Sequence, residues 1–504
     1  MPSKKTKERE LEPVIGLEIH IQLKTKSKMF CACDNTGENQ PANTTICPIC
    51  TGQPGTLPAI NRQAVDFALK MALALNCQIS EETKFDRKNY FYPDLPKGYQ
   101  ISQYDQPIAK NGHLSIGKHK IRINRAHLEE DAAKLLHSAD TKNSLVDFNR
   151  AGTPLLEIVT EPDINSSEEA KMFLQELRLL ARYLEISDAD MEKGHLRCDA
   201  NISLRPKGDK KLHAKTEVKN LNSFRNVERA LIYEIERQTE LWLSNTPRVS
   251  SETRGWNDKK QITVEQRGKE ETQDYRYFPE PDLPPLMIDA KWLEKIKGEM
   301  PELPQAKAER FIEQYEFSPD DAQILVNNKK LADYSEQVIS ELKAWLVALE
   351  EMAGSEEEIW QKHKKQLSQL AANWLINKLF GLLFDKKISF SQMKVTPENF
   401  AEFITLIYQN KINSRNALEI LSEMLDTGAD PSHILADKNL GQISDEEEII
   451  KIIKKVTKNN PEQVKQYRSG KEALLQFFIG QVMKATRGQA DPILVEKLLK
   501  QELR

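Results

Sequence analysis

The segment of residues 195–205 alternates polar and apolar residues, reading His-Leu-Arg-Cys-Asp-Ala-Asn-Ile-Ser-Leu-Arg. Side chains along a strand point to opposite faces in turn. One face would therefore carry only groups that bind charge or donate and accept hydrogen bonds: His195, Arg197, Asp199, Asn201, Ser203 and Arg205. The pattern predicts either the floor of a polar site or an ordinary antiparallel strand with one face in solvent.

A second segment, from Val14 to Leu23, favours the polar site. It places Glu18 and His20 two residues apart on one face of another strand. Further candidates follow other strand-like segments: Glu129, Glu130, Asp131, Glu157, and the pair Glu217 and Lys219. Carboxylates on one sheet repel one another unless a cation lies among them. Oxygen ligands with one imidazole suit Mg²⁺ or Mn²⁺ and the phosphates it carries. The alternative is a set of unrelated surface acids.

Four of the six cysteines have the spacing of a metal site. Cys31 and Cys33 form a C-x-C pair, and Cys47 and Cys50 form a C-x-x-C pair after a gap of 13 residues. Four thiolates in two short-spaced pairs are typical of a closed, tetrahedral structural zinc site. Free thiols and disulfides are the alternatives, and disulfides are unfavourable in a reducing compartment.

Length and composition predict a multidomain globular protein. The chain has 504 residues, 39% of them hydrophobic and 29% charged, and no apolar run reaches the length of a membrane helix. The charged first residues lack the apolar stretch of a secretory signal, so we expect a disordered leader and a cytoplasmic protein without membrane contact. Residues 451–504 hold 12 Lys and Arg against 5 Asp and Glu. This basic end suggests a polyanionic partner, or only a solvated helical face.

The fold class that we predict is α+β, with an antiparallel sheet first and helices afterwards. Strand-like segments and a few helices fill the chain up to a proline-rich stretch near residue 280, and amphipathic helical segments follow. Helices are expected at about 61–76, 167–185, 223–244, 331–352, 358–385, 396–410, 471–484 and 492–503. The predicted parts are a leader (1–12), a catalytic domain (13–295), a helical domain (296–410) and a tail domain (411–504).

The segment Gly112-His-Leu-Ser-Ile-Gly-Lys-His119 nearly fits a phosphate-binding P-loop. His119 stands where a P-loop has the Ser or Thr that binds magnesium. We therefore interpret Asn111-Gly112 as a hairpin turn between two strands. Neither an amidase-like Gly-Gly-Ser-Ser-Gly-Gly run nor a poised catalytic cysteine is found in the sequence.

Several long motifs resemble the GatB family, the B subunits of the aspartyl/glutamyl-tRNA amidotransferases. They are Val14-Ile-Gly-Leu-Glu-Ile-His20, Phe85-Asp-Arg-Lys-Asn-Tyr-Phe-Tyr-Pro93, Tyr99-Gln-Ile-Ser-Gln103, Asn149-Arg-Ala-Gly-Thr-Pro-Leu-Leu-Glu157, Arg197-Cys-Asp-Ala-Asn-Ile-Ser203 and Asp274-Tyr-Arg-Tyr-Phe-Pro-Glu-Pro281. The run from Gly480 to Ala490 resembles the family's YqeY-like tail domain. The resemblance covers nearly the whole chain from about residue 13.

The resemblance implies a fold, an activity and partners. The first domain would have the glutamine synthetase/guanidino kinase type of sheet. The protein would act in a heterotrimer with the A and C subunits, the first of which is the glutaminase that releases ammonia. ATP would phosphorylate the side-chain carboxylate of Glu on tRNA-Gln or Asp on tRNA-Asn, and ammonia would displace the phosphate. A non-catalytic tRNA-binding scaffold is the competing hypothesis, although phosphate binding alone has no use for clustered carboxylates.

The resemblance also assigns roles to residues. Glu18, His20, Glu130 and Glu157 would be Mg²⁺ and ATP-site residues, with Asp199 a further catalytic candidate. Arg197, Arg205 and Lys219 are candidate phosphate clamps, or else surface ion pairs of the sheet. Lys484 and Arg487 would contact the tRNA backbone. The four cysteines match a zinc knuckle found in part of the family, so the zinc would be structural.

Overall fold

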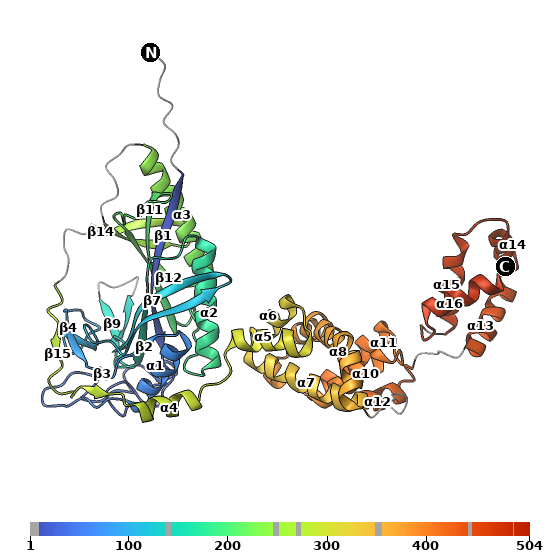
Figure 1. Ribbon diagram of the computed structural model, residues 1–504, viewed down its shortest axis with the longest axis horizontal. Coiled ribbons are helices and arrows are strands. Elements are labelled where there is room, and N and C mark those ends of the chain that lie inside the picture. The colour runs from blue at the N-terminus through green and yellow to red at the C-terminus, as the bar shows by residue number, and fades with distance from the viewer. Residues whose placement is uncertain are drawn as a thin grey trace, which may run out of the picture. The chain divides into compact units, whose positions relative to one another are not determined.

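The computed structural model describes residues 10–137, 143–244, 251–268, 274–347, 355–441, 446–486 and 488–503. The chain divides into two compact units, Met1–Leu303 and Pro304–Arg504 (Figure 1). The first unit combines sheets with helices and the second contains helices, so the predicted α+β class is confirmed.

A nine-stranded sheet forms the frame of the first unit. Each pair of neighbouring strands is antiparallel except β12 and β13, which run parallel, so the expected all-antiparallel sheet is corrected to a mixed one. In spatial order the strands are β14 (Ile262–Gly268), β13 (Glu252–Asn257), β12 (Thr216–Leu221), β11 (Leu196–Pro206), β1 (Leu11–Gln22), β10 (Pro154–Thr160), β7 (His119–Glu130), β6 (Ala109–Ile116) and β2 (Gln78–Ile79).

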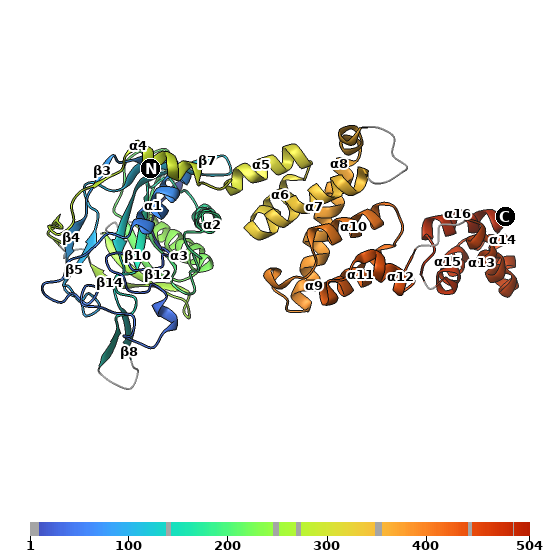
Figure 2. The same cartoon turned by 90° about the horizontal axis from the view of Figure 1, so that it is seen from below.

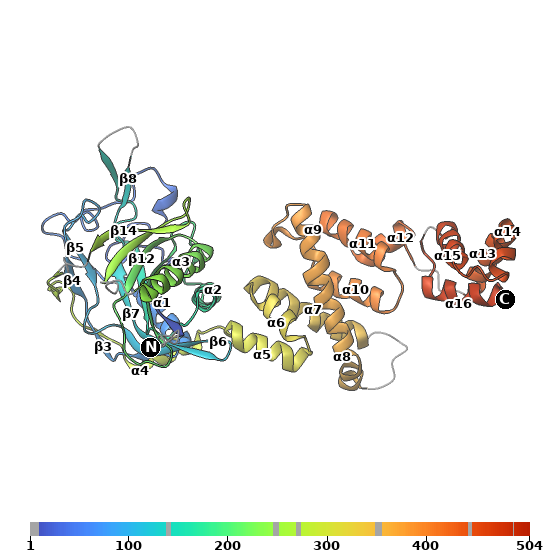
Figure 3. The same cartoon turned by 90° about the horizontal axis from the view of Figure 1, so that it is seen from above.

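One face of this sheet is apolar and buried beneath helices (Figure 3). Leu17, Ile19 and Ile21 of β1 are at most 1% exposed and belong to the same core as the inner sides of the covering helices. Serine side chains cap two of these helices, as Ser166 accepts from the Glu169 N–H and Ser223 from the Asn226 N–H. The helices of this unit are α1 (Arg62–Ala74), α2 (Ser167–Tyr183), α3 (Phe224–Leu243) and α4 (Ala290–Gly298).

Smaller sheets accompany the nine-stranded sheet, and one of them contacts its polar face through Ser102 and Glu129. One pairs β15 (Phe278–Pro279), β4 (Asp86–Asn89) and β5 (Tyr99–Ser102), and another pairs β16 (Leu286–Met287) with β3 (Glu82–Thr83). The hairpin of β8 (Lys134–His137) and β9 (Ser144–Asp147) projects from the body of the unit (Figure 2). A short 3₁₀ helix, Gly37–Asn39, lies in the cysteine-containing loop.

Two expectations about the first unit are corrected. β1 begins at Leu11, so the last residues of the predicted leader belong to the sheet, and residues 1–9 lie outside the described part. The hairpin between β6 and β7 turns at Gly117, because Asn111 and Gly112 lie inside β6. A Cβ atom on Gly112 would lie 2.6 Å from the Leu75 carbonyl oxygen, so this glycine permits a close approach of two backbones.

The second unit is built from helices around two separate cores. They are α5 (Pro304–Tyr315), α6 (Pro319–Val326), α7 (Lys329–Val347), α8 (Glu356–Asn373), a π-helix (Trp374–Leu379), α9 (Phe380–Asp385), a 3₁₀ helix (Phe390–Gln392), α10 (Pro397–Tyr408), α11 (Ser414–Thr427), α12 (Pro431–Asp437), α13 (Glu446–Asn459), α14 (Pro461–Arg468), α15 (Leu474–Ala485) and α16 (Pro492–Glu502). One core extends from Ala308 to Ile434 and the other from Ile449 to Leu503, so the predicted boundary at residue 410 falls inside the first. Across the described ranges, each helix is too short or too polar to pass through a bilayer.

Candidate functional site

The register of four central strands brings the predicted acids and His20 together. On β1, Glu18 lies opposite Asp199 of β11, and His20 lies opposite both Arg197 of β11 and Glu157 of β10. Glu157 in turn lies opposite His127 of β7. Directly opposed residues in a sheet share a face, so strand pairing alone places these side chains side by side.

Two histidines and three carboxylates form what we call the acid–histidine cluster: Glu18, His20, His127, Glu129 and Glu157. The His20 Nε2 atom lies 3.4 Å from Glu129 Oε1 and 3.5 Å from Glu157 Oε2. The His127 Nε2 atom lies 2.9 Å from Glu157 Oε2 and 3.7 Å from Glu129 Oε2. Ligand atoms of Glu18, His20 and Glu157, and likewise of His127, Glu129 and Glu157, all lie within 4.8 Å of one another.

The electrostatics of the acid–histidine cluster are those of a site crowded with negative charge. Burial and then the Glu157 carboxylate raise the pKa of Glu18. Burial alone would lower the pKa of His127, but the nearby carboxylates of Glu157 and Glu129 have the larger effect and raise this pKa to about 9. Burial would raise the pKa of Glu157, but His127 and His20 hold it well below its ordinary value. Protonated imidazoles thus neutralise carboxylates that a divalent cation could neutralise instead.

Cationic side chains flank the acid–histidine cluster on the β11 side. The Lys219 Nζ atom lies 2.6 Å from Asp199 Oδ2 and 3.0 Å from Glu217 Oε1. The Arg197 guanidinium donates to buried Asp131 over 2.7 Å. The structure therefore brings Arg197, Asp199 and Lys219 to the rim of the cluster, where positive charge could meet phosphate.

Two predicted site residues lie elsewhere. Glu130 points away from the cluster, where it pairs with Lys97 and accepts from the Ile101 N–H over 3.0 Å. Arg205 pairs with Glu12 over 2.6 Å, six residues along β11 from Asp199 and therefore roughly 20 Å away. Because alternation along a strand separates neighbours, Glu129 occupies the place that we had assigned to Glu130.

His127 was not among the residues predicted from the sequence, although a signal for it exists. His127, Glu129 and Asp131 alternate along the end of β7 just as Glu18 and His20 do on β1. Arg125, two residues earlier, places a guanidinium nitrogen 3.9 Å from Glu157 Oε1. Alternation applied to residues 125–131 would have selected the correct set.

Tyrosines of the resemblance motifs, together with Tyr104 directly after one of them, lie near the acid–histidine cluster. Tyr277 stacks on Tyr104 with ring centroids 4.1 Å apart, and burial followed by the fields of Glu157 and Glu129 raises its pKa. Tyr90 packs edge-on against Tyr275, with centroids 5.9 Å apart. Ser102 of β5 donates to Glu129 over 3.4 Å. The segments just outside the strands of the smaller β4–β5–β15 sheet therefore supply an aromatic wall close to the buried acids.

The four predicted zinc ligands gather in one loop region. The sulfur atoms of Cys31, Cys33, Cys47 and Cys50 lie within 4.8 Å of one another. Those of Cys47 and Cys50 are 3.8 Å apart, close to the roughly 3.8 Å edge of a tetrahedron with Zn–S bonds of about 2.3 Å. Fully buried Lys28 places its ammonium 3.7 Å from Cys50 Sγ. The donor set therefore fits a zinc ion.

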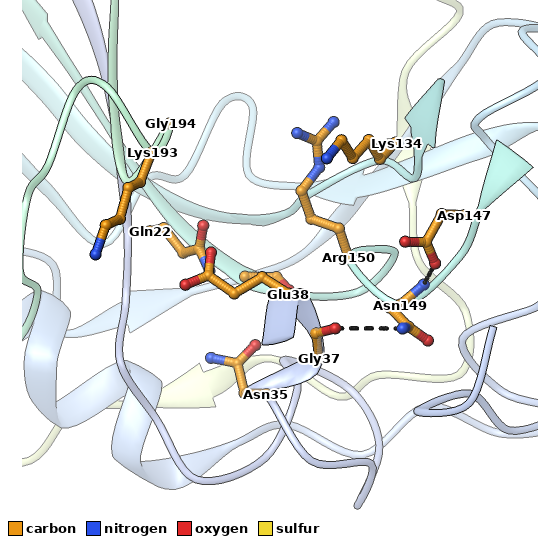
Figure 4. A pocket seen from close by; sticks show the side chains of 11 residues that line it. Gln22, Asn35, Gly37, Glu38, Lys134, Asp147, Asn149, Arg150, Lys193 and Gly194 are labelled. Carbon is orange, nitrogen blue, oxygen red and sulfur yellow. Dashed lines mark hydrogen bonds between the residues drawn. The ribbon is translucent and has the colours of Figure 1, made fainter. Parts of the chain in front are cut away.

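A polar pocket of about 120 Å³ lies at the end of the same strands (Figure 4). Gln22 of β1 and Glu38 of the cysteine-containing loop lie between Lys193 on one side and Arg150 with Lys134 on the other. The His195 Nε2 atom lies 3.1 Å from Glu38 Oε2. We call this the terminal pocket.

The predicted tRNA contacts lie at the end of the chain. Lys484 is exposed in the last turn of α15, and Arg487 lies outside the described residues. Lys484 also lines a hollow with Arg415 and Ile493.

Comparisons with known proteins agree with these features. The family described as the GatB/GatE catalytic domain matches residues 13–294, and the GatB domain matches residues 357–503. Three similar proteins are named as B subunits of the aspartyl/glutamyl-tRNA(Asn/Gln) amidotransferase. That of Persephonella marina is 47% identical over 98% of this chain and 100% of its own length. That of Thermotoga maritima is also 47% identical, over 97% of this chain and 98% of its own. The Carboxydothermus hydrogenoformans protein is 46% identical over 98% and 99%.

Proposed function

Because the chain belongs to the GatB family of tRNA amidotransferase B subunits, we propose that it amidates Glu on tRNA-Gln or Asp on tRNA-Asn. The acid–histidine cluster is the observation that carries this proposal. It joins five ionisable side chains from three neighbouring strands on one face of the sheet. A surface that only bound tRNA would gain nothing from buried carboxylates, because they repel phosphate.

The reaction needs activation of the carboxylate. A carboxylate is a poor electrophile, so its oxygen attacks the γ-phosphorus of ATP and ADP leaves. Ammonia then attacks the acyl carbon, inorganic phosphate departs with the bond electrons, and the nitrogen loses a proton. The products are the side-chain amide, ADP and phosphate.

The residues divide this work between them. Glu18, His20, His127, Glu129 and Glu157 would hold Mg²⁺ or Mn²⁺, which neutralises charge on the transferred phosphoryl group. Arg125 lies beside Glu157, and Arg197 lies opposite His20 while it pairs with Asp131; both would bind phosphate oxygens. Asp199 orients Lys219 at the same rim. Tyr277 and Tyr104 would shield the reacting atoms from water.

The proposal extends to partners and location. The names of the relatives describe them as subunits, so we place this chain in a cytoplasmic complex with the A and C subunits. The first of these partners is the glutaminase that supplies ammonia, and Lys484 with Arg487 contacts the tRNA backbone. The four cysteines would hold a structural zinc ion that takes no part in the chemistry.

ATP cleavage that depends on Glu-tRNA-Gln or Asp-tRNA-Asn tests the proposal in the assembled trimer. Glu18→Gln and His20→Ala should each lower the rate at least a hundredfold while tRNA affinity stays within about twofold. Glu12→Gln is the matched control, because Glu12 lies on the same strand but pairs with Arg205. Unchanged cleavage in both cluster variants would leave the scaffold hypothesis standing. Activity of the isolated chain with ammonium, but not with glutamine, would support the division of labour.

A further inference from the structure

We propose that the terminal pocket binds the α-ammonium group of the aminoacyl residue that is to be amidated. This inference rests on the proposed function, since it assigns one end of the same substrate. It concerns how the substrate is held, because Gln22, Asn35 and Glu38 lie outside the acid–histidine cluster.

The position of the terminal pocket supports this assignment. Gln22 follows His20 by two residues on the same face of β1, so the pocket begins roughly 7 Å further along the strand. Gln22 also donates its N–H to the His195 carbonyl over 2.8 Å, which ties the pocket to β11. A glutamyl side chain with bonds of about 1.5 Å spans roughly 6 Å from its nitrogen to its carboxylate. One residue can therefore occupy both places at once.

The chemistry of the pocket suits a group that donates several hydrogen bonds. Glu38 supplies a carboxylate, whose two oxygens lie 3.2 and 3.1 Å from the His195 Nε2 atom. Asn35 is 9% exposed, and its Oδ1 atom has no hydrogen-bond partner within the described residues, although its Nδ2 atom donates to the Leu23 carbonyl. A buried acceptor without a donor is costly, so it marks a place for a ligand. An ammonium group offers three donors.

The cations of the terminal pocket suit the rest of the substrate. Lys134 and Arg150 lie together at one side, and Lys193 lies at the other (Figure 4). The aminoacyl ester continues into the 3′-terminal nucleotide, whose phosphodiester is an anion. A pocket with both signs of charge therefore fits a charged tRNA end better than it fits a free metal ion or a free phosphate.

The test combines one substitution with one change to the substrate, in the assembled trimer. Glu38→Gln should raise the KM for Glu-tRNA about tenfold, because a charge-assisted hydrogen bond is removed, and the KM for ATP should stay constant. N-acetylation of the glutamyl residue removes the ammonium charge. It should weaken binding to the unaltered protein by a similar factor but have little effect on Glu38→Gln.

Matched variants separate binding from a general structural effect. Glu192→Gln removes an exposed acid near Lys193 that does not line the pocket, and it should change nothing. Lys193→Met should weaken charged and uncharged tRNA equally. Equal losses of Glu-tRNA and N-acetyl-Glu-tRNA in Glu38→Gln, or an equal loss of uncharged tRNA, would overturn the inference. Absence of tRNA-dependent ATP cleavage in the unaltered trimer would instead overturn the proposed function.

Discussion

At the scale of single residues, the charge of His127 decides the state of the metal-free site. His127 is buried beside Glu129 and Glu157, and its pKa is raised to about 9. An unfolded histidine titrates near 6.5. The protonated imidazole therefore stabilises the fold fully below about pH 6.5, and this contribution is lost as the pH rises through 9.

In the chelator-treated protein, loss of the His127 proton between pH 6.5 and 9 should lower the free energy of unfolding by on the order of 3 kcal/mol. Urea unfolding at several pH values measures it. His127→Gln should flatten the curve over that window, whereas His363→Gln, in the other unit, should leave the curve unchanged. Parallel curves for the unaltered protein and His127→Gln would contradict the prediction. Magnesium should reduce the same slope, since it replaces the proton.

A second residue-scale prediction concerns Lys28 beside the cysteines. Four zinc-bound thiolates carry two negative charges in excess, and buried Lys28 compensates part of this charge near Cys50. We expect about one zinc ion per chain in the purified protein. Lys28→Met should release it severalfold faster to a chelator, as followed with a metal-sensitive dye. Lys28→Arg keeps the charge and should stay close to the unaltered rate; equal rates for Met and Arg would exclude a charge effect.

Residue types and spacing predicted much of the site but not all of it. Glu18 and His20 were identified from a strand of alternating polar and apolar residues, and Glu157 from a strand-like segment and the family resemblance. The structure brings the three together. Glu130 was selected over Glu129 from the family resemblance, without a check of which face of β7 each residue occupies, and one step along a strand reverses the face. Arg205 was included because a polar face says nothing of distance from the reacting atoms.

At the scale of elements, Gly112 shows how the frame of the sheet depends on close backbone contacts. A Cβ atom there would lie 2.2 Å from Cys77 Sγ and 2.6 Å from the Leu75 carbonyl oxygen. The backbone cannot yield as a flexible side chain does, so Gly112→Ala should cost roughly 1–3 kcal/mol in urea unfolding. Gly298→Ala is the control, because nothing lies within 4 Å of the added atom at the end of α4. Stability in Gly112→Ala equal to that of the control would refute the close contact.

Elements with strong local signals were predicted well. The expected helices at 61–76, 167–185 and 223–244 correspond to α1, α2 and α3, and side-chain caps explain their sharp starts. The parallel pairing of β12 with β13 was missed, although α3 lies between them in the sequence and a helix is the usual connection between parallel neighbours. The prediction of a turn at Asn111-Gly112 was wrong, because this glycine permits a close approach of the Leu75 backbone, which is distant in sequence.

At the scale of the whole molecule, the chain forms three separate hydrophobic cores. The sheet unit has its own core, and the helices contribute two more, of which the last spans Ile449 to Leu503. The sequence predicted an early sheet and a late helical part from changes in composition. It placed the final boundary too early, because helical periodicity continues across residue 410 and does not reveal which core a helix joins.

The last prediction concerns the contribution of the basic end of the chain to tRNA binding. Residues 451–504 carry 12 Lys and Arg against 5 Asp and Glu. Removal of everything after residue 441 takes away these 12 cations, together with the acids of residues 445–448 that precede them. Each phosphate interaction that disappears should reduce the slope of log affinity against log salt by roughly 0.7–0.9. The truncated protein should therefore bind tRNA more weakly at low salt and with a slope shallower by about two or more, as measured by filter binding. Magnesium binding should remain, because the acid–histidine cluster lies within a unit with its own core. Parallel slopes for the full-length and truncated proteins would show that the tRNA contacts lie elsewhere, whereas loss of magnesium binding would show that the sheet unit depends on the removed helices.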